Sequence, residues 1–199
     1  MKKFGTAIIL AGGKSSRMGF DKQFLKINEK RLMNLVIKKL EEEFDEVIIV
    51  TNKPEEYSGF SQKIRTDIFK EMGPLGGIHS GLMEASSEYS FVIACDMPNI
   101  NMEYIRYMRE IINDKEIDAC VTLNKNNIEP LHGFYSKGII KDIEKHLLSN
   151  RRSINSLITK LNTHYVRESE FIKFSSNKEI FKNLNTKEDL EDFLLYYNE

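Results

Sequence analysis

The sequence predicts an α/β protein with a mostly parallel, mixed sheet and helices on both of its faces. Short apolar runs typical of buried strands recur at 7–11, 47–51, 91–95 and 119–123. Helical apolar stripes separate these runs, and parallel strands need such crossover connections. With 199 residues and 41% hydrophobic content, the chain is expected to form a single domain over residues 1–199.

The other expected elements follow the same alternation. After the first strand we expect a short extended piece at 24–27, then a helix that ends near Glu43. Further strands are expected at 63–66 and 164–166. Further helices are expected where apolar residues recur at helical spacing, around 78–85, 105–112, 139–147 and 154–161.

Two segments near the end of the alternation have their own signals. Residues 128–135 follow a polar turn at 124–127 and are expected to be extended but to leave the parallel alternation, which predicts the mixed sheet. Thr186 is expected to cap the last helix, with Asp189 in a reciprocal contact.

Composition excludes several classes of protein. The net charge of −1 argues against a general nucleic-acid surface, and no apolar run is long enough to span a membrane. Cys95 and Cys120 lie in apolar runs without CxxC spacing, and the four histidines show no paired ligand spacing for zinc. We therefore expect a cytoplasmic protein, a monomer, that acts on small molecules.

A glycine loop directly after the first strand is the strongest candidate site. Leu10 and Ala11 end the strand, and Gly12 and Gly13 follow without Cβ atoms, so main-chain N–H groups can approach phosphate oxygens. Two cations, Arg17 and Lys22, come next and would offset phosphate charge. Ligands of such sheets bind beyond the carboxyl ends of the strands.

The spacing of this loop excludes two familiar phosphate-binding loops. A Walker A loop that ends at Gly13-Lys14-Ser15 would need a glycine at Ile8, and a dinucleotide fingerprint from Gly12 would need glycines at 14 and 17. Residues 10–22 instead resemble the LAGGxSxRMGxDK signature of the molybdenum cofactor guanylyltransferases. Matches of the same kind, GPLGGI at 73–78 and CDMP at 95–98, extend the resemblance over most of the chain.

The resemblance implies a Rossmann-like nucleotidyltransferase fold and a Mg²⁺-dependent transfer of GMP from GTP to molybdopterin, with release of pyrophosphate. Other molybdenum cofactor proteins and client apoenzymes would then be partners. The enzymatic alternatives are a cytidylyltransferase for cytosine-type molybdenum cofactors or methylerythritol phosphate, and a sugar-phosphate nucleotidyltransferase. The alternative from another class is a non-catalytic protein that binds a nucleotide and delivers the cofactor.

Two carboxylates are candidates for the nucleotide and its metal. Asp96 follows a buried strand and precedes Pro98, where it can serve either as a helix cap or as a Mg²⁺ ligand. The resemblance implies the metal role. Asp67 follows another strand, and the resemblance places it in the nucleotide site, with the base, the ribose and the metal all open as its partner. Asn52 is a weaker candidate for the base or ribose.

The end of the chain supplies candidates for the acceptor side. Residues 181–190 resemble an FxNxNTPEDL ending, with Lys187 in place of the proline. The resemblance implies that Asn183 and Asn185 face the pterin, while an Asx-turn pair before the helix is the structural alternative. Arg151 and Arg152 are open between an acceptor-phosphate contact and a solvated helix start.

Overall fold

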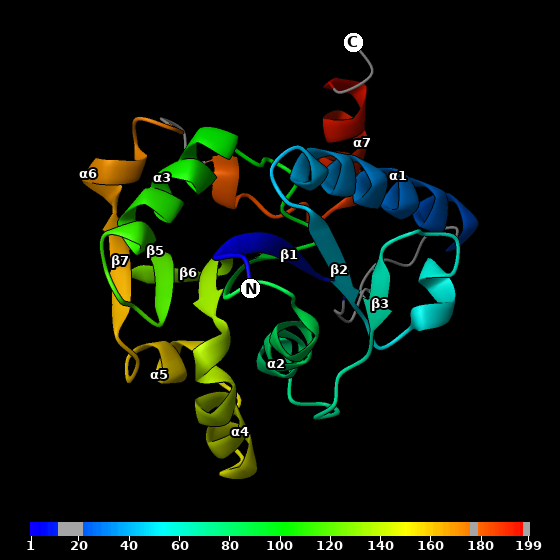
Figure 1. The fold of residues 1–199 in the computed structure, drawn as a ribbon. Helices are drawn as coiled ribbons and strands as arrows, with labels where there is room; N and C mark the ends of the chain where they lie inside the picture. The colour runs from blue at the N-terminus through cyan, green and yellow to red at the C-terminus, as the bar shows by residue number, and fades with distance from the viewer. Residues whose placement is uncertain (12–21, 176–178, 197–199) are drawn as a thin grey trace.

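The computed structural model describes residues 1–11, 22–175 and 179–196. Its centre is a seven-stranded sheet in the order β3-β2-β1-β4-β6-β5-β7 (Figure 1). The mixture of parallel and antiparallel strands is the one that the sequence predicts. The strands are β1 (Phe4–Leu10), β2 (Glu46–Val50), β3 (Lys63–Arg65), β4 (Tyr89–Ala94), β5 (Ala119–Asn124), β6 (Asn127–Ser136) and β7 (Thr163–Arg167).

The first four strands are parallel neighbours. β1 pairs with β2 on one side and with β4 on the other, so its residues have strand neighbours on both edges. β6 then runs antiparallel to both β4 and β5, and β7 is parallel to β5. β5 and β6 form a hairpin through residues 124–127, and its second strand, β6, lies beside β4.

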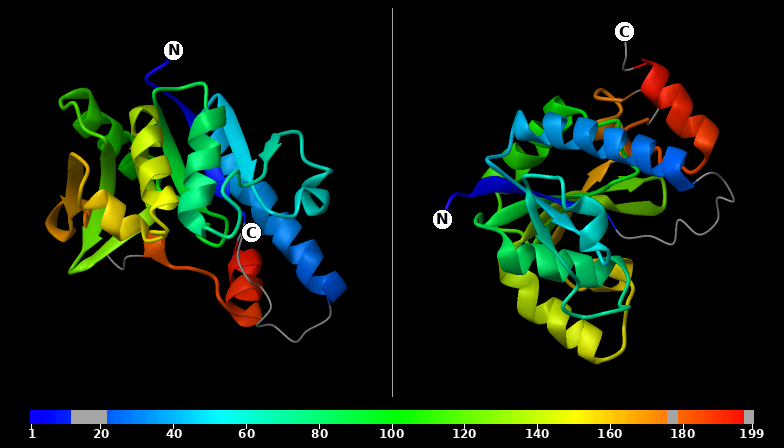
Figure 2. Two further views of the ribbon diagram at one scale, coloured as in Figure 1. Left: turned by 90° about the horizontal axis from the view of Figure 1, so that it is seen from below. Right: turned by 90° about the vertical axis from the view of Figure 1, so that its right-hand side faces the viewer.

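Helices cover both faces of this sheet. The helices are α1 (Lys22–Glu41), α2 (Pro74–Glu84), α3 (Met102–Asn113), α4 (Ile140–Leu148), α5 (Ile154–Ile158), α6 (Glu168–Phe171) and α7 (Lys187–Tyr196). Short 3-10 turns lie at η1 (Pro54–Tyr57), η2 (Lys137–Ile139) and η3 (Glu179–Phe181). Figure 2 shows α1 and α7 on one side of the sheet and α2 and α4 on the other.

The alternation of side chains along β1 divides the core into two layers. Ile9 belongs to the layer that also contains Leu40 of α1 and Met108 of α3, whereas Ile8 belongs to the layer with Leu82 of α2 and Ile143 of α4. A strand whose residues are buried on both faces reads as a continuous apolar run, which is why the sequence identified it.

One expected element is wrong. Residues 24–27, expected to be extended, lie inside α1, which begins at Lys22. A four-residue apolar segment does not separate a strand from a helix by its period, and no glycine or proline interrupts 22–41 to keep the helix from extending backwards. The helix ends at Glu41, close to the expected Glu43.

None of the described helices combines the length and the apolar character that a membrane-spanning helix needs.

Candidate functional site

The carboxyl ends of β1, β2 and β4 meet at one edge of the sheet, which we call the rim. The amide of Ala11 donates to the Val50 carbonyl at 2.8 Å, and the amide of Cys95 donates to the Leu10 carbonyl at 3.1 Å. Leu10 and Ala11 are 9% and 7% exposed. Both residues are therefore almost fully buried at the end of β1, and the sheet already occupies the Leu10 carbonyl and the Ala11 amide.

The glycine loop that follows Ala11 is not among the residues that the structure describes. Gly12, Gly13 and Arg17 lie outside the described residues. Lys22 is the first residue of α1, which places its main chain at the return from the glycine loop, and its side chain is not described. Their roles stay predictions.

Asp67 and Asn52 come together beyond the ends of β3 and β2. The Asn52 Nδ2 atom donates to Asp67 Oδ2 at 2.9 Å. Burial raises the pKa of the Asp67 carboxyl, and the hydrogen bond from Asn52 lowers it in part. Asn52 is the only described side chain that donates to this carboxylate, so both of its oxygens keep lone pairs that can accept from a ligand.

Two glycines of α2 pack closely against the loop after Asp67 and against β1. A Cβ atom at Gly76 would lie 2.9 Å from the Phe69 carbonyl oxygen, and one at Gly77 would lie 3.1 Å from Leu10 Cδ2. The same Cβ positions lie at ordinary contact distances from the Asp67 carboxylate, 3.8 Å from Oδ2 and 3.6 Å from Oδ1 respectively. The helix starts after Gly73, whose φ of 67° lies in the region that favours glycine. Ser80 Oγ, one turn further along α2, accepts from the Ile68 amide at 2.9 Å and ties the loop to the helix.

Asp96 stands at the end of β4, as its position in the sequence predicts. Its side chain is half-buried, and burial raises the pKa of its carboxyl, with a hydrogen bond from its own amide acting in the opposite direction. Among the described residues no other side chain hydrogen-bonds this carboxylate. A desolvated carboxylate that no described cationic side chain neutralises is well suited to bind a cation.

The donor set at the rim fits Mg²⁺. Magnesium accepts oxygen ligands and needs only one or two protein carboxylates when phosphates and water complete its shell. The described residues contain no group of three or more His, Cys, Asp or Glu that could hold a metal ion by themselves. Asp96 therefore suits an ion shared with a polyphosphate rather than one enclosed by protein.

The C-terminal strap, residues 179–185, crosses the rim beside Asp96. The amide of Leu184 donates to the Asp96 carbonyl at 2.8 Å. Asn183 and Asn185 flank Leu184 and are both exposed, with Asn185 Nδ2 at 3.4 Å from the Asn183 carbonyl. The strap thus brings both asparagines near Asp96, although the local bond also suits the Asx-turn alternative.

The predicted cap of the last helix is confirmed. Thr186 Oγ1 accepts from the Asp189 amide at 3.0 Å, and Asp189 Oδ2 accepts from the Thr186 amide at 3.0 Å. Two reciprocal bonds of this kind satisfy donors at the start of a helix and fix the direction of the incoming chain. These bonds therefore fix the end of the strap at Asn185.

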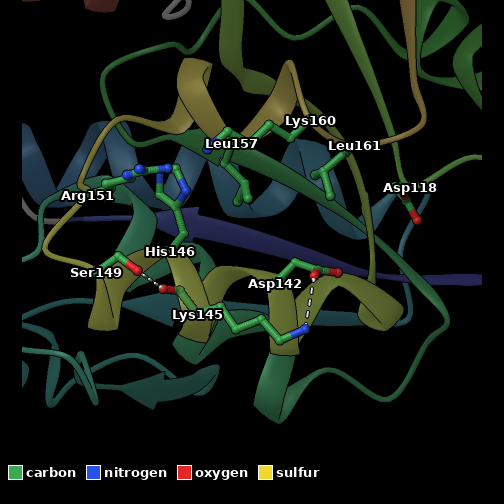
Figure 3. A pocket seen from close by; sticks show the side chains of 9 residues that line it. All are labelled: Asp118, Asp142, Lys145, His146, Ser149, Arg151, Leu157, Lys160 and Leu161. Atoms are coloured by element: carbon green, nitrogen blue, oxygen red, sulfur yellow. Dashed lines mark hydrogen bonds and ion pairs between the residues drawn. The ribbon is translucent and has the colours of Figure 1, made fainter.

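The two consecutive arginines point to different places. Arg152 donates to the Glu71 carbonyl at 3.2 Å, in the loop that leads from Asp67 to α2. Arg151 instead lines a pocket of about 330 Å³ between α4 and α5 (Figure 3). Neither Asp67, Asp96 nor the strap asparagines line that pocket.

Sequence reasoning overlooked the aromatic support beneath the strap. His132 of β6 is fully buried, no other described residue hydrogen-bonds either of its ring nitrogens, and burial lowers its pKa to about 4. Its ring meets Phe91, Tyr104 and Phe181 at centroid distances of 5.0, 5.8 and 5.4 Å. The only signal in the sequence was the alternation of 130–134, which places His132 and Phe134 on the same side of the strand.

A mixed sheet with candidate nucleotide-binding residues at the carboxyl ends of its first strands is the architecture of a nucleotidyltransferase. Residues 7–165 match the model of the MobA-like NTP transferase domain. The chain belongs to this family, that of the molybdenum cofactor guanylyltransferases.

Curated relatives agree with this assignment, and a solved structure shares the fold. The chain is 51% identical to the "Probable molybdenum cofactor guanylyltransferase" of Peptoclostridium acidaminophilum, covering 96% of this chain and 89% of that one. It is 46% identical to the "Molybdenum cofactor guanylyltransferase" of Syntrophotalea carbinolica, with 95% and 90% covered. The crystal structure of molybdopterin-guanine dinucleotide biosynthesis protein A from Archaeoglobus fulgidus shares the fold, with a TM-score of 0.79, 24% identity, and 97% and 98% covered.

Proposed function

We propose that the chain transfers GMP from GTP to the terminal phosphate of molybdopterin and forms the guanine dinucleotide and pyrophosphate. The observation that carries this proposal is that Asp67, Asp96 and the strap with Asn183 and Asn185 lie at one edge of the sheet, where the parallel strands β1 to β4 have their carboxyl ends. A nucleotide site and an acceptor site must adjoin for such a transfer. The printed names of the relatives supply the guanine and the molybdenum cofactor.

The proposed reaction needs no general base. An oxygen of the acceptor phosphate, already anionic at neutral pH, attacks the α-phosphorus of GTP. The bond from that phosphorus to the oxygen bridging to the β-phosphorus breaks, and the electron pair leaves with pyrophosphate. Catalysis then consists of alignment and charge neutralisation.

Each rim residue has a proposed part in this alignment. Main-chain groups of Leu10 to Gly13 bind the nucleotide, and Asp67 accepts hydrogen bonds from it. Arg17 and Lys22 neutralise phosphate charge, and Asp96 holds a Mg²⁺ ion, which when bound draws negative charge from the phosphates. Asn183 and Asn185 orient the pterin, as the family resemblance implies.

The function is tested directly by product formation. Purified protein with Mg²⁺, molybdopterin and GTP should release one pyrophosphate for each dinucleotide formed, and omission of molybdopterin should abolish release. A protein that binds GTP but releases no pyrophosphate would be the delivery protein of the alternative hypothesis. Equal or faster release from CTP would indicate a cytidylyltransferase.

A cytoplasmic, monomeric enzyme that serves client apoenzymes fits this role.

Lys22 offers a test of the phosphate contacts. We expect Lys22→Ala to lower the transfer rate by about a hundredfold, in the range seen when one group that stabilises transition-state charge is lost. Guanosine, which has no phosphate, should bind the variant as well as it binds the native protein in a calorimetric titration. Lys30→Ala, an exposed lysine of the same helix, is the control. Equal loss of guanosine and GTP affinity would contradict a phosphate contact.

A further inference from the structure

The loop from β4 to α3, residues 95–101, is bound to the end of the chain at several points. Besides the bond from Leu184 to Asp96, Asn99 Nδ2 donates to the Glu179 carbonyl at 3.1 Å. Asn101 Nδ2 donates to the Phe174 carbonyl at 2.9 Å. The loop that carries Asp96 is therefore shaped in part by a segment about 80 residues away in sequence.

Phe181 fixes the strap to the body of the protein. Its ring meets the rings of His132, Phe171 and Tyr104 edge-on, with centroid distances of 5.4, 5.2 and 6.4 Å and interplanar angles of 86°, 89° and 83°. Edge-to-face packing of this kind is favourable and directional. These rings come from β6, α6 and α3, so the contact joins the strap to three separate elements.

The rings of His132, Phe171 and Tyr104 form a cage around Phe181, and His132 contributes to it as an uncharged ring. Its complete burial and the lack of a described partner for either nitrogen keep it neutral at physiological pH. A neutral imidazole at this position can pack against Phe181 without the desolvation cost of a charge. The packing of the cage on Phe181 therefore carries no ring charge at physiological pH.

We propose that Phe181 is a positioning residue that couples the acceptor side of the site to the metal side. With its ring in the cage, the strap places the Leu184 amide against the Asp96 carbonyl and thereby holds the main chain from which the Asp96 carboxylate projects. The proposal rests on the proposed function, in which Asp96 binds the ion and Asn183 and Asn185 bind the acceptor. Because coupling is reciprocal, acceptor binding to a docked strap also tightens the ion.

The first test compares Phe181→Ala with Phe181→Leu. With GTP present and no acceptor, Mn²⁺ binding followed by electron paramagnetic resonance should weaken at least about fivefold in Phe181→Ala, the lower end of typical coupling between sites. Phe181→Leu should restore most of it, because leucine refills the cage. Phe4→Ala is the matched control: Phe4 is also a half-buried ring, with Tyr89 and Phe134 at 5.8 and 5.7 Å, at the opposite end of β1.

Kinetics provide the second readout. In Phe181→Ala, saturating Mg²⁺ should recover most of kcat, whereas a merely destabilised enzyme would keep its Mg²⁺ dependence. The double variant Asn183→Ala/Asn185→Ala keeps the cage and should raise the KM for molybdopterin without weakening Mn²⁺. Native Mn²⁺ affinity in Phe181→Ala would overturn the coupling. Native Mn²⁺ affinity in Asp96→Asn would overturn the metal assignment itself.

A second variant removes the linking hydrogen bond without touching the cage. Leu184→Pro lacks the amide that donates to Asp96, whereas Leu184→Ala keeps it and loses only the side-chain packing on Leu32. The affinity for Mn²⁺ should fall in the proline variant and remain near normal in the alanine variant. Equal effects of the two would overturn the link, even if Phe181→Ala proves too unstable to purify.

Discussion

Replacing Asp96 by asparagine is expected to lower the rate of guanylyl transfer by two to four orders of magnitude. A metal ion in such a site stabilises transition-state charge by several kcal/mol, and each 1.36 kcal/mol corresponds to about a tenfold change in rate. The amide keeps the shape of the carboxylate but removes the charge that attracts the ion. Initial rates measured across a Mg²⁺ titration will show the loss.

The fold should survive this change. The bond that Asp96 makes to the strap uses its carbonyl, which asparagine retains, and its carboxylate has no other side chain to lose among the described residues. Burial raises the pKa of Asp96 by disfavouring its charged form, so a neutral amide has a smaller desolvation cost there than the carboxylate. Thermal unfolding should be nearly unchanged, as in the control Asp142→Asn at an exposed position of α4. Near-native turnover at saturating Mg²⁺ would remove Asp96 from the metal site.

The sequence allowed the strands to be located because their local signals are strong. Strands such as β1 and β4 are buried on both faces and stand out as apolar runs, and Asp96 was found because it directly follows one of them. The order of β5 and β6 was not predictable in the same way. A hairpin that returns can place either of its strands beside β4, and the choice depends on packing between distant segments rather than on local pattern.

Individual site residues could be predicted where their place directly after a strand identifies them, but their contacts with distant segments could not. Asp67 and Asn52 were each identified after a strand, but their hydrogen bond depends on the pairing of β2 with β3, which no local pattern encodes. The cage around Phe181 was missed for the same reason, since its rings come from separate elements. The divergence of Arg151 and Arg152 likewise reflects the path of a loop between two short helices.

The choice of nucleotide should depend on Asp67. Guanine presents adjacent N1–H and N2–H donors, which a carboxylate can accept together, while adenine and cytosine cannot replace both. A buried polar group left without a partner costs about 1–3 kcal/mol, and about 1.4 kcal/mol is tenfold in affinity. We therefore expect GTP to bind at least about tenfold more tightly than CTP, ATP or UTP, and Asp67→Ala to lose most of that preference.

The pH dependence of this preference identifies the carboxylate. Burial raises the pKa of Asp67, so the carboxyl accepts a proton, and loses its ability to accept two hydrogen bonds, at a higher pH than an ordinary aspartate. The ratio of GTP to ATP affinity should be constant above that pKa and decline as pH falls through it. Measuring a ratio cancels the titration of the phosphates, which both nucleotides share.

Asn52→Ala supplies the decisive comparison. The Asn52 hydrogen bond lowers the pKa of Asp67, so its removal should shift the midpoint of the decline to higher pH while the preference at neutral pH is largely retained. Calorimetric titrations of GTP and ATP between about pH 4.5 and pH 8 will give both quantities, a range that starts just above the unperturbed pKa of aspartate. An unshifted midpoint would place the discriminating group elsewhere. A clear preference for CTP in the native protein would replace the guanylyl assignment with a cytidylyl one.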